Sequence, residues 1–260
     1  MLQIKIGIQL ASLRLPFPKA LLTARQLGAD AVEIDARGEI RPETLSHTGV
    51  RQIRKMMDDL NLRVSAVSFR TRRGYHVLDD LDRRLEATRQ AMRMAYDLGC
   101  GVVVNQLGPL PDEADSSAWE TLLAALADLG RHGQKVGALL AAETGPDSGS
   151  AVAKLLSRLP TGSLGIDFNP AQLILHGHSP AAAMRELAAQ VLHMHATDAT
   201  RDLELRRGIE TALGRGGAEF PELLAILEEQ QYRGYITVER RDASDPSGEI
   251  AQAVRFLRNL

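Results

Sequence analysis

The fold is decided by a pattern that is clearest in the stretch Leu98-Gly99-Cys100-Gly101-Val102-Val103-Val104-Asn105. A helical pattern ends at Leu98, glycine follows, and three valines begin a short apolar run. Glycine directly after a helical period is a common signal for the end of a helix. A run that is apolar on both faces is typical of a parallel strand packed between a core and a layer of helices. The stretch therefore predicts a helix, a tight turn and a buried parallel strand.

The same alternation continues along all 260 residues. The apolar runs of strand length are Ile4–Leu10, Ala31–Asp35, Leu62–Phe69, Gly101–Gln106, Ala138–Glu143, Ser163–Phe168, Val191–Ala196 and Tyr235–Glu239. The segments with a helical period are Phe17–Leu27, Pro42–Leu60, Leu81–Leu98, Ala118–His132, Ser150–Leu159, Pro180–Ala189, Phe220–Gln231 and Ile250–Leu260. Strict alternation predicts a parallel sheet, and eight repeats favour its closure into a (β/α)₈ TIM barrel, a single domain over residues 1–260. The alternative is an open, doubly wound sheet.

Composition excludes several classes of protein. A net charge of -2 gives no basic excess for holding a nucleic acid, so we expect no such partner. The single cysteine, Cys100, excludes an intrachain disulfide framework and a multi-thiolate metal site. The sequence has no apolar run of about 18 residues and no signal-peptide pattern, which predicts a cytoplasmic protein without a membrane partner. A homo-oligomer is compatible with the sequence.

The reactive groups of such a barrel lie at the carboxyl ends of its strands. Glu143, Asn169, His195 and Glu239 stand at or directly after four predicted strand ends. Two carboxylates, an imidazole and an amide oxygen suit a hard or borderline divalent ion: Mn²⁺, Mg²⁺ or Co²⁺, with Zn²⁺ as a further option. Without a cation the two glutamates would repel each other, and one would take up a proton. We therefore predict that these four residues bind a metal ion.

Each of these residues also has a purely structural interpretation. Glu143 and Glu239 could form buried ion pairs with a neighbouring arginine such as Arg240. His195 could be a hydrogen-bonded core histidine. Asn169 could be a turn residue that hydrogen-bonds the backbone before Pro170.

Five segments carry a resemblance to a known family. They are Ala142–Gly145, Gly165–Leu173, His193–Asp198, Leu213–Phe220 and Gly234–Arg240. Over essentially the whole chain, the sequence resembles the xylose isomerase-like TIM barrels. This is the sugar phosphate isomerase/epimerase superfamily, which also includes ketose 3-epimerases, inosose dehydratase and, more distantly, endonuclease IV.

The resemblance implies roles for individual residues. It places metal ligands at Glu143, His195 and Glu239, and it makes the two glutamates the acid/base pair that moves a proton next to a carbonyl group. The fourth ligand is usually an aspartate and falls on Asn169, which can offer an oxygen but no negative charge. A lysine often found before the aspartate that follows the metal histidine is Thr197 here.

Substrate contacts are expected at four further residues. Arg201 matches an arginine that contacts substrate oxygens in the ketose epimerases. Gln172 is the last residue of the run Asn169-Pro170-Ala171-Gln172, which aligns with an Asp-Pro-x-Asn or Asp-Pro-x-His run of the family. His193 is the first member of the His-x-His pair, one layer deeper in the barrel, and Arg72 belongs to a basic loop after the third strand. That loop and the glycine-rich helix start at residues 214–217 could hold an anion. The expected partner is therefore a small carbohydrate, with phosphorylated and acidic sugars included.

These observations predict a metal-dependent sugar or sugar-phosphate isomerase/epimerase. Two alternatives remain open. The first is a binding protein of the same fold whose metal site has eroded through Asn169. The second is an inosose-type dehydratase, which would form the same intermediate and then lose hydroxide. An abasic-site nuclease is disfavoured, because the strand ends offer too few ligands for three zinc ions and the charge balance gives little hold on DNA.

Overall fold

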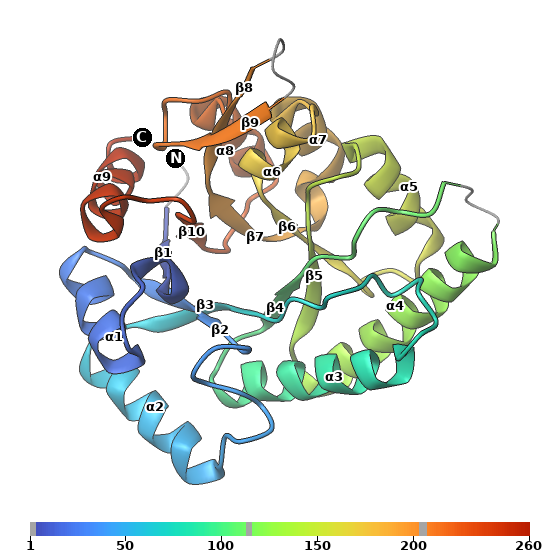
Figure 1. Cartoon of the computed structure of the whole chain (residues 1–260), viewed down its shortest axis with the longest axis horizontal. Coiled ribbons are helices and arrows are strands. Elements are labelled where there is room, and N and C mark those ends of the chain that lie inside the picture. The colour runs from blue at the N-terminus through green and yellow to red at the C-terminus, as the bar shows by residue number, and fades with distance from the viewer. Residues whose placement is uncertain (1–3, 113–115, 203–206) are drawn as a thin grey trace.

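Parallel strands form a closed barrel in the computed structural model, which describes residues 4–112, 116–202 and 207–260 (Figure 1). The order around the barrel is β1-β10-β7-β6-β5-β4-β3-β2. Its strands are β1 (Ile6–Gln9), β2 (Ala31–Asp35), β3 (Arg63–Ser68), β4 (Val102–Asn105), β5 (Leu139–Glu143), β6 (Gly165–Phe168), β7 (Val191–Ala196) and β10 (Ile236–Val238). The first and last strands pair in parallel, with Ile6 opposite Ile236 and Ile8 opposite Val238. This pairing closes the sheet and confirms the predicted TIM barrel over the open alternative.

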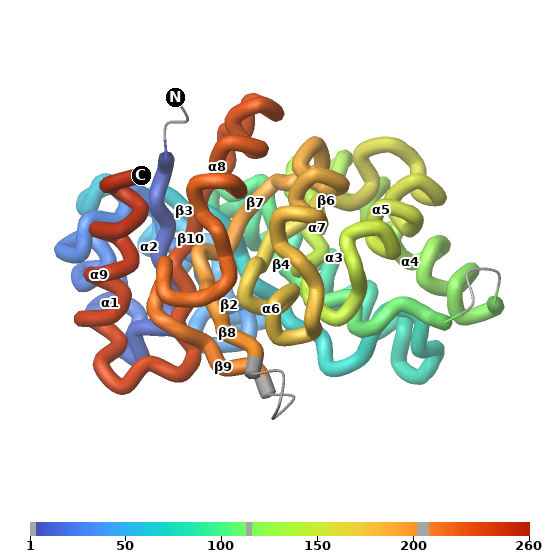
Figure 2. Tube along the Cα trace, turned by 90° about the horizontal axis from the view of Figure 1, so that it is seen from above, coloured from blue at the N-terminus to red at the C-terminus, as the bar shows by residue number. Residues whose placement is uncertain are grey.

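Helices surround the barrel (Figures 1 and 2). They are α1 (Phe17–Gln26), α2 (His47–Asp59), α3 (Leu81–Asp97), α4 (Ser117–Val136), α5 (Gly149–Arg158), α6 (Pro170–Leu175), α7 (Pro180–Leu187), α8 (Phe220–Glu229) and α9 (Pro246–Arg258). Their apolar faces pack on the outer faces of the strands and form one continuous core. Within the described ranges, none of the helices has the length and apolar character that spanning a bilayer requires.

Local sequence sets the ends of the helices. The hydroxyl oxygen of Ser46 accepts a hydrogen bond from the backbone N–H of Gly49, and Ser116 caps α4 in the same way. Such caps satisfy N–H groups that the first helical turn leaves free. Helix α4 runs four residues beyond the predicted end at His132 and stops at Gly137, whose φ of 90° suits glycine.

Two features of the chain were not predicted, and both lie at the carboxyl end of the barrel. The short helix α6 directly follows β6. The strands β8 (Asp198–Asp202) and β9 (Arg207–Thr211) form an antiparallel hairpin between β7 and α8. Figure 2 shows α6, β8 and β9 on the same side of the molecule. They extend the barrel rim over the strand ends where the predicted reactive residues lie.

The inside of the barrel is polar near its centre. Thr237 on β10 and Ser65 on β3 are buried there and are joined by a hydrogen bond of 3.0 Å between their hydroxyl oxygens. Gly7 on β1 leaves the space that they fill, because a Cβ atom at this position would lie 2.3 Å from the Thr237 oxygen. The barrel therefore accommodates a hydrogen-bonded network in place of an apolar layer.

Candidate active site

Buried ionisable side chains from five strands meet at the carboxyl end of the barrel. They are Glu33 on β2, Glu143 on β5, Asp167 on β6, His193 and His195 on β7, and Glu239 directly after β10. Parallel strands in a closed barrel bring their carboxyl ends to a common centre, which explains why residues so distant in sequence share one site. Asn169 lies beside them after β6. The structure thus brings together the four residues predicted to hold a metal ion.

Asp167 forms the floor of the site by accepting hydrogen bonds from two histidines. Its Oδ1 lies 2.7 Å from His193 Nδ1, and its Oδ2 lies 2.8 Å from His195 Nδ1. The other nitrogen of His193 contacts the Thr237 hydroxyl at 2.7 Å. Burial alone would raise the pKa of Asp167, but the positive charge of His195 lowers it below its usual range. Asp167 is therefore an anion that orients both imidazole rings.

His195 lies between two carboxylates. Its Nδ1 faces Asp167, and its Nε2 lies 2.8 Å from Glu33 Oε2. Burial acts to lower the pKa of His195, but the negative charges of Asp167 and Glu33 raise it well above its ordinary value. In this arrangement both ring nitrogens donate a hydrogen bond, so the ring carries a positive charge. A metal ion would have to replace one of these protons.

Glu143 and Glu239 face each other across two arginines. Arg241 Nε lies 2.8 Å from Glu239 Oε1, and its Nη2 lies 3.3 Å from Glu143 Oε1. Arg70 Nη2 lies 3.2 Å from Glu239 Oε1 and 3.4 Å from Glu143 Oε2. The glutamates are buried, whereas each arginine side chain is 36% exposed. The arginines therefore cover the carboxylates from the solvent side.

The two glutamates differ in their proton affinity. Burial raises the pKa of Glu143; Arg70 opposes this shift, and the negative charge of Glu239 adds to it. Burial acts on Glu239 in the same direction, but His195 and Arg241 lower its pKa to about 2. One carboxylate is thus held ionised while its neighbour takes up a proton more readily, which is the arrangement that separates acid and base roles in enzymes.

Asn169 binds the glutamates through its amide nitrogen. Its Nδ2 donates to Glu143 Oε1 at 2.9 Å and to Glu239 Oε2 at 3.3 Å. Its Oδ1 accepts from the backbone N–H of Gln172 at 3.2 Å and from the Thr197 hydroxyl at 2.6 Å. Because a backbone N–H can only donate, it fixes which end of the amide faces the glutamates. This orientation corresponds to the hydrogen-bonding interpretation of Asn169.

The residues present fit a divalent cation. Two groups, Glu143 with His195 and Glu239, and Glu33 with His193 and His195, each place their ligand atoms within 4.8 Å of one another. Oε2 of Glu143 is buried and accepts no hydrogen bond among the described residues. An oxygen and nitrogen donor set of this kind suits Mg²⁺, Mn²⁺ or Co²⁺. The structure therefore contains two candidate groups of ligands for a divalent ion among its described residues.

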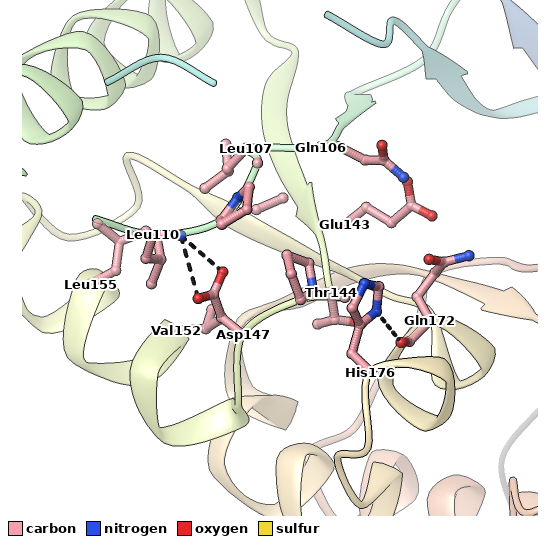
Figure 3. Close-up of a pocket in the computed structure, with 15 residues that line it drawn as sticks. Gln106, Leu107, Leu110, Glu143, Thr144, Asp147, Val152, Leu155, Gln172 and His176 are labelled. Carbon is pink, nitrogen blue, oxygen red and sulfur yellow. Dashed lines mark hydrogen bonds between the residues drawn. The ribbon is translucent and has the colours of Figure 1, made fainter. Parts of the chain in front are cut away.

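Cavities reach the two glutamates from different directions. Glu143 borders a cavity of about 240 Å³ between the loops that follow β4 and β5, where Gln106 and Gln172 also point (Figure 3). Glu239 borders a cavity of about 360 Å³ whose lining includes Asn169, Gln172 and Arg241. Gln172 lines both cavities. Cavities therefore flank the carboxylate pair on both sides, and a small molecule would reach the carboxylates by displacing the arginines that cover them.

The other predicted substrate residues lie in different places. Gln172 borders the site, as described above. His193 lies beneath it, and both of its ring nitrogens are hydrogen-bonded to protein groups. Arg72 lines a separate cavity above β3 and α3. Arg201 on β8 packs its guanidinium group against Gly177, and it is absent from the lining of the two cavities at the glutamates.

Arg241 and Glu33 were not assigned a site role from the sequence. Side chains that are two residues apart along an extended segment point to the same face, so Arg241 shares a face with Glu239. Arg240, the partner suggested by the sequence, instead binds Glu210 at 2.6 Å. The same period of two places Glu33 on the face opposite to its apolar neighbours Val32 and Ile34. The signal was present in both segments, but it did not show which partner each charge would take.

Comparisons with known proteins agree with this architecture. The chain is 24% identical over 223 residues to an inosose dehydratase from Clostridium beijerinckii, which covers 73% of each chain. Among solved structures, a xylose isomerase domain protein from Planctomyces limnophilus superposes with a TM-score of 0.86 at 25% identity, over 98% of this chain and 96% of that one. A D-tagatose 3-epimerase-like protein superposes with a TM-score of 0.77 at 21% identity, over 98% of both chains. The family profile described as xylose isomerase-like TIM barrel matches residues 21–260, and the chain belongs to that family.

Proposed function

We propose that this protein is an isomerase or epimerase of a small carbohydrate that moves a proton at a carbon next to a carbonyl group. The observation that carries this proposal is the pair of buried carboxylates Glu143 and Glu239. They come from strands three places apart in the barrel, share hydrogen-bond donors and border cavities on different sides. For a sugar carbon to present one face to each carboxylate, the two side chains would have to separate from the donors that now bridge them. One glutamate would remove the proton, and the other would return a proton to the opposite face or to the neighbouring carbon.

Glu143, His195 and Glu239 are the residues that would hold a divalent ion: Mn²⁺, Mg²⁺, Co²⁺ or Zn²⁺. Such an ion supplies positive charge that stabilises the enediolate formed when the proton is removed. Asn169 positions the two glutamates through its N–H groups. Its Oδ1 could join the ligands only after the amide turned over and released the N–H of Gln172. Arg70 and Arg241 keep both carboxylates oriented and offer donors to substrate oxygens.

A dehydratase is the second candidate, because the relative from Clostridium beijerinckii is named an inosose dehydratase. The same proton removal would then be followed by loss of a hydroxide ion from the next carbon, and a protonated glutamate could donate the proton that this step needs. A binding protein is the third candidate. The arginine and asparagine contacts of the two glutamates favour it, since these contacts satisfy the carboxylates without an ion.

Deuterium exchange separates the three candidates. The purified protein is incubated in D₂O with Mn²⁺ and a panel of ketoses, ketose phosphates, sugar acids and inososes, and proton NMR follows the hydrogen next to each carbonyl. An isomerase or epimerase places deuterium in substrate and product, and a dehydratase forms an unsaturated ketone with ultraviolet absorbance. Binding without exchange on every compound would contradict both enzyme proposals.

Two variants and one control make the assay specific. We expect Glu143→Gln and Glu239→Gln each to lower the exchange rate by about 10²- to 10⁴-fold, the usual contribution of a general acid or base. Glu120→Gln, on the exposed start of α4, removes a carboxylate far from the barrel mouth and should leave the rate unchanged. Full exchange activity in either of the first two variants would refute the acid/base assignment.

A further inference from the structure

A cavity of about 380 Å³ opens beside Glu239 near the carboxyl ends of β1, β2 and β3. We call it the arginine cavity, because its lining includes Arg14, Arg37, Arg70, Arg240 and Arg241. Its lining carboxylates are only Asp35 and Glu239. A concave wall with an excess of one charge concentrates ions of the opposite sign.

Carboxylates neutralise three of the five arginines. Arg240 lies 2.6 Å from Glu210 and 2.5 Å from Glu249, both outside the cavity lining. Arg70 and Arg241 bind the two catalytic glutamates, as described above. These three guanidinium groups therefore belong to existing ion pairs. The other two, Arg14 and Arg37, share the cavity wall with the carboxylate of Asp35.

Arg14 is held in the cavity wall by backbone carbonyl groups. Its Nη1 donates to Ala243 O at 3.1 Å, and its Nη2 donates to Arg241 O at 2.6 Å. Carbonyl groups orient the guanidinium without cancelling its charge. The backbone of Arg14 is left-handed, with φ 54° and ψ 35°, a conformation that costs free energy in a residue with a side chain. Among the described residues, no carboxylate forms an ion pair with the Arg14 guanidinium group.

Arg37 is oriented by an aromatic ring. Its guanidinium carbon lies 4.4 Å from the centre of the Phe69 ring. Over residues 4–112, 116–202 and 207–260 no carboxylate forms an ion pair with the Arg37 side chain, and Asp35 binds only its backbone N–H. Stacking restricts a guanidinium group and leaves its in-plane N–H donors free for an anion. The cavity thus has two oriented cations with no carboxylate partner of their own.

A second arginine-rich cavity, of about 470 Å³, shares Arg37 with the arginine cavity, and its lining also includes Arg72, Arg73, Arg83 and Arg84. Neither Glu143 nor Glu239 lines it. The arginine cavity, in contrast, includes Glu239. An anionic group on a molecule that reacts at the glutamates would therefore enter the arginine cavity.

We propose that the arginine cavity binds an anionic group of the substrate, a phosphate or a carboxylate, through Arg14 and Arg37. The substrate would then be a sugar phosphate or a sugar acid, and a neutral sugar would bind poorly. This inference rests on the proposed function for the position of the reacting carbon. The anion contact itself is a binding event that can be measured without turnover.

Calorimetric titration of the Mn²⁺-loaded protein tests the proposal with four probes: a neutral ketohexose, its 6-phosphate, a ketohexonate and inorganic phosphate. We expect at least one anionic sugar to bind more tightly than the neutral sugar, and the tighter of the two identifies the anion. Arg37→Gln should weaken that binding by about 10- to 100-fold, the usual effect of removing a hydrogen bond to a charged group, and should leave the neutral sugar unchanged. Arg14→Gln tests the second contact, with thermal unfolding as a check on folding. Arg25→Gln, exposed on α1, is the matched control and should change no affinity.

The outcomes separate this inference from the proposed function. Equal binding of neutral and anionic sugars, or no binding of any anion, would overturn the anion site even if deuterium exchange occurs. A preference that survives Arg14→Gln but disappears in Arg72→Gln would also overturn it, because the anion would then occupy the neighbouring cavity. A preference lost in both Arg14→Gln and Arg37→Gln but kept in Arg72→Gln supports the anion site, because Arg37 lines both cavities whereas Arg14 lines only the arginine cavity of the two. It does so even where no deuterium exchange is found and the proposed reaction fails.

Discussion

Replacing Asn169 by aspartate tests how the site balances its charges. The Asn169 amide nitrogen donates to Glu143 at 2.9 Å and to Glu239 at 3.3 Å. Aspartate keeps an oxygen for the N–H of Gln172 and for the Thr197 hydroxyl. It replaces the donor, however, with a negative oxygen that faces two carboxylates. The Asn169→Asp variant should therefore be less stable than the native protein when no metal ion is bound.

The size of the effect follows from these contacts. Each lost hydrogen bond to a charged group costs about 1.5–3 kcal/mol. Two like charges about 4 Å apart repel by about 4 kcal/mol at an effective dielectric constant of about 20. Proton uptake by one of the acids relieves part of this repulsion, so we expect a net loss of about 3–5 kcal/mol near neutral pH. A third carboxylate also strengthens the metal site, and a hundredfold excess of Mn²⁺ over its dissociation constant would return about 2.7 kcal/mol.

Urea denaturation in EDTA and in Mn²⁺ measures both effects. The variant should unfold at lower urea concentration than the native protein in EDTA, and Mn²⁺ should stabilise it more than it stabilises the native protein. Asn259→Asp, at the exposed end of α9, adds the same charge away from the site and should show neither effect. Equal stability of Asn169→Asp and the native protein in EDTA would refute the charge argument. A smaller response of the variant to Mn²⁺ would refute the metal-site argument.

Three further predictions concern the scaffold. Burial raises the pKa of Tyr75 from 10.0 to about 12, so over this range the unfolded chain loses a proton that the folded chain keeps, and stability falls as pH rises. Between about pH 9 and about pH 12, the free energy of unfolding of Tyr75→Phe should therefore fall by about 2–3 kcal/mol less than that of the native protein. Urea titrations measure both losses, and equal losses would contradict this. Gly7→Ala would place a Cβ atom 2.3 Å from the Thr237 hydroxyl and should cost about 1–3 kcal/mol in urea unfolding, whereas an unchanged midpoint would show that the barrel can widen there. Arg240→Met should lower the free energy of unfolding by about 3–5 kcal/mol, because it leaves the carboxylates of Glu210 and Glu249 without their cation. A thermal scan tests this loss, and a midpoint equal to that of the native protein would show that water replaces the guanidinium group.

The repeating strands and helices of the barrel could be predicted because each produces a local pattern of apolar and polar residues. Apolar runs mark all eight barrel strands, and glycine marks turns such as the one at residues 98–101. The six-residue helix α6 and the hairpin of β8 and β9 were missed for a physical reason. A helix of fewer than two turns shows little periodicity, and the hairpin strands are polar segments that pair with each other over the rim.

The candidate site was predictable as far as backbone position decides it. Glu143, His195 and Glu239 lie together because parallel strands end at one edge of the barrel. The orientation of the Asn169 amide was not predictable, because it depends on competition between the N–H of Gln172 and an ion for one oxygen. The pairing of Arg241 with the glutamates depends in the same way on which of two adjacent arginines finds a nearer acceptor.

Oε2 of Glu143, which lies 3.4 Å from Arg70 Nη2 but accepts no hydrogen bond among the described residues, has a consequence for attempts to stabilise this barrel. A buried carboxylate oxygen without a hydrogen-bond partner lowers the stability of the fold. Screening of a mutant library for heat resistance alone would therefore favour apolar or amide replacements at this position. Such a library would yield more heat-stable variants that have lost the proposed acid/base group. Selection should therefore test thermal stability and catalytic activity together from the first round.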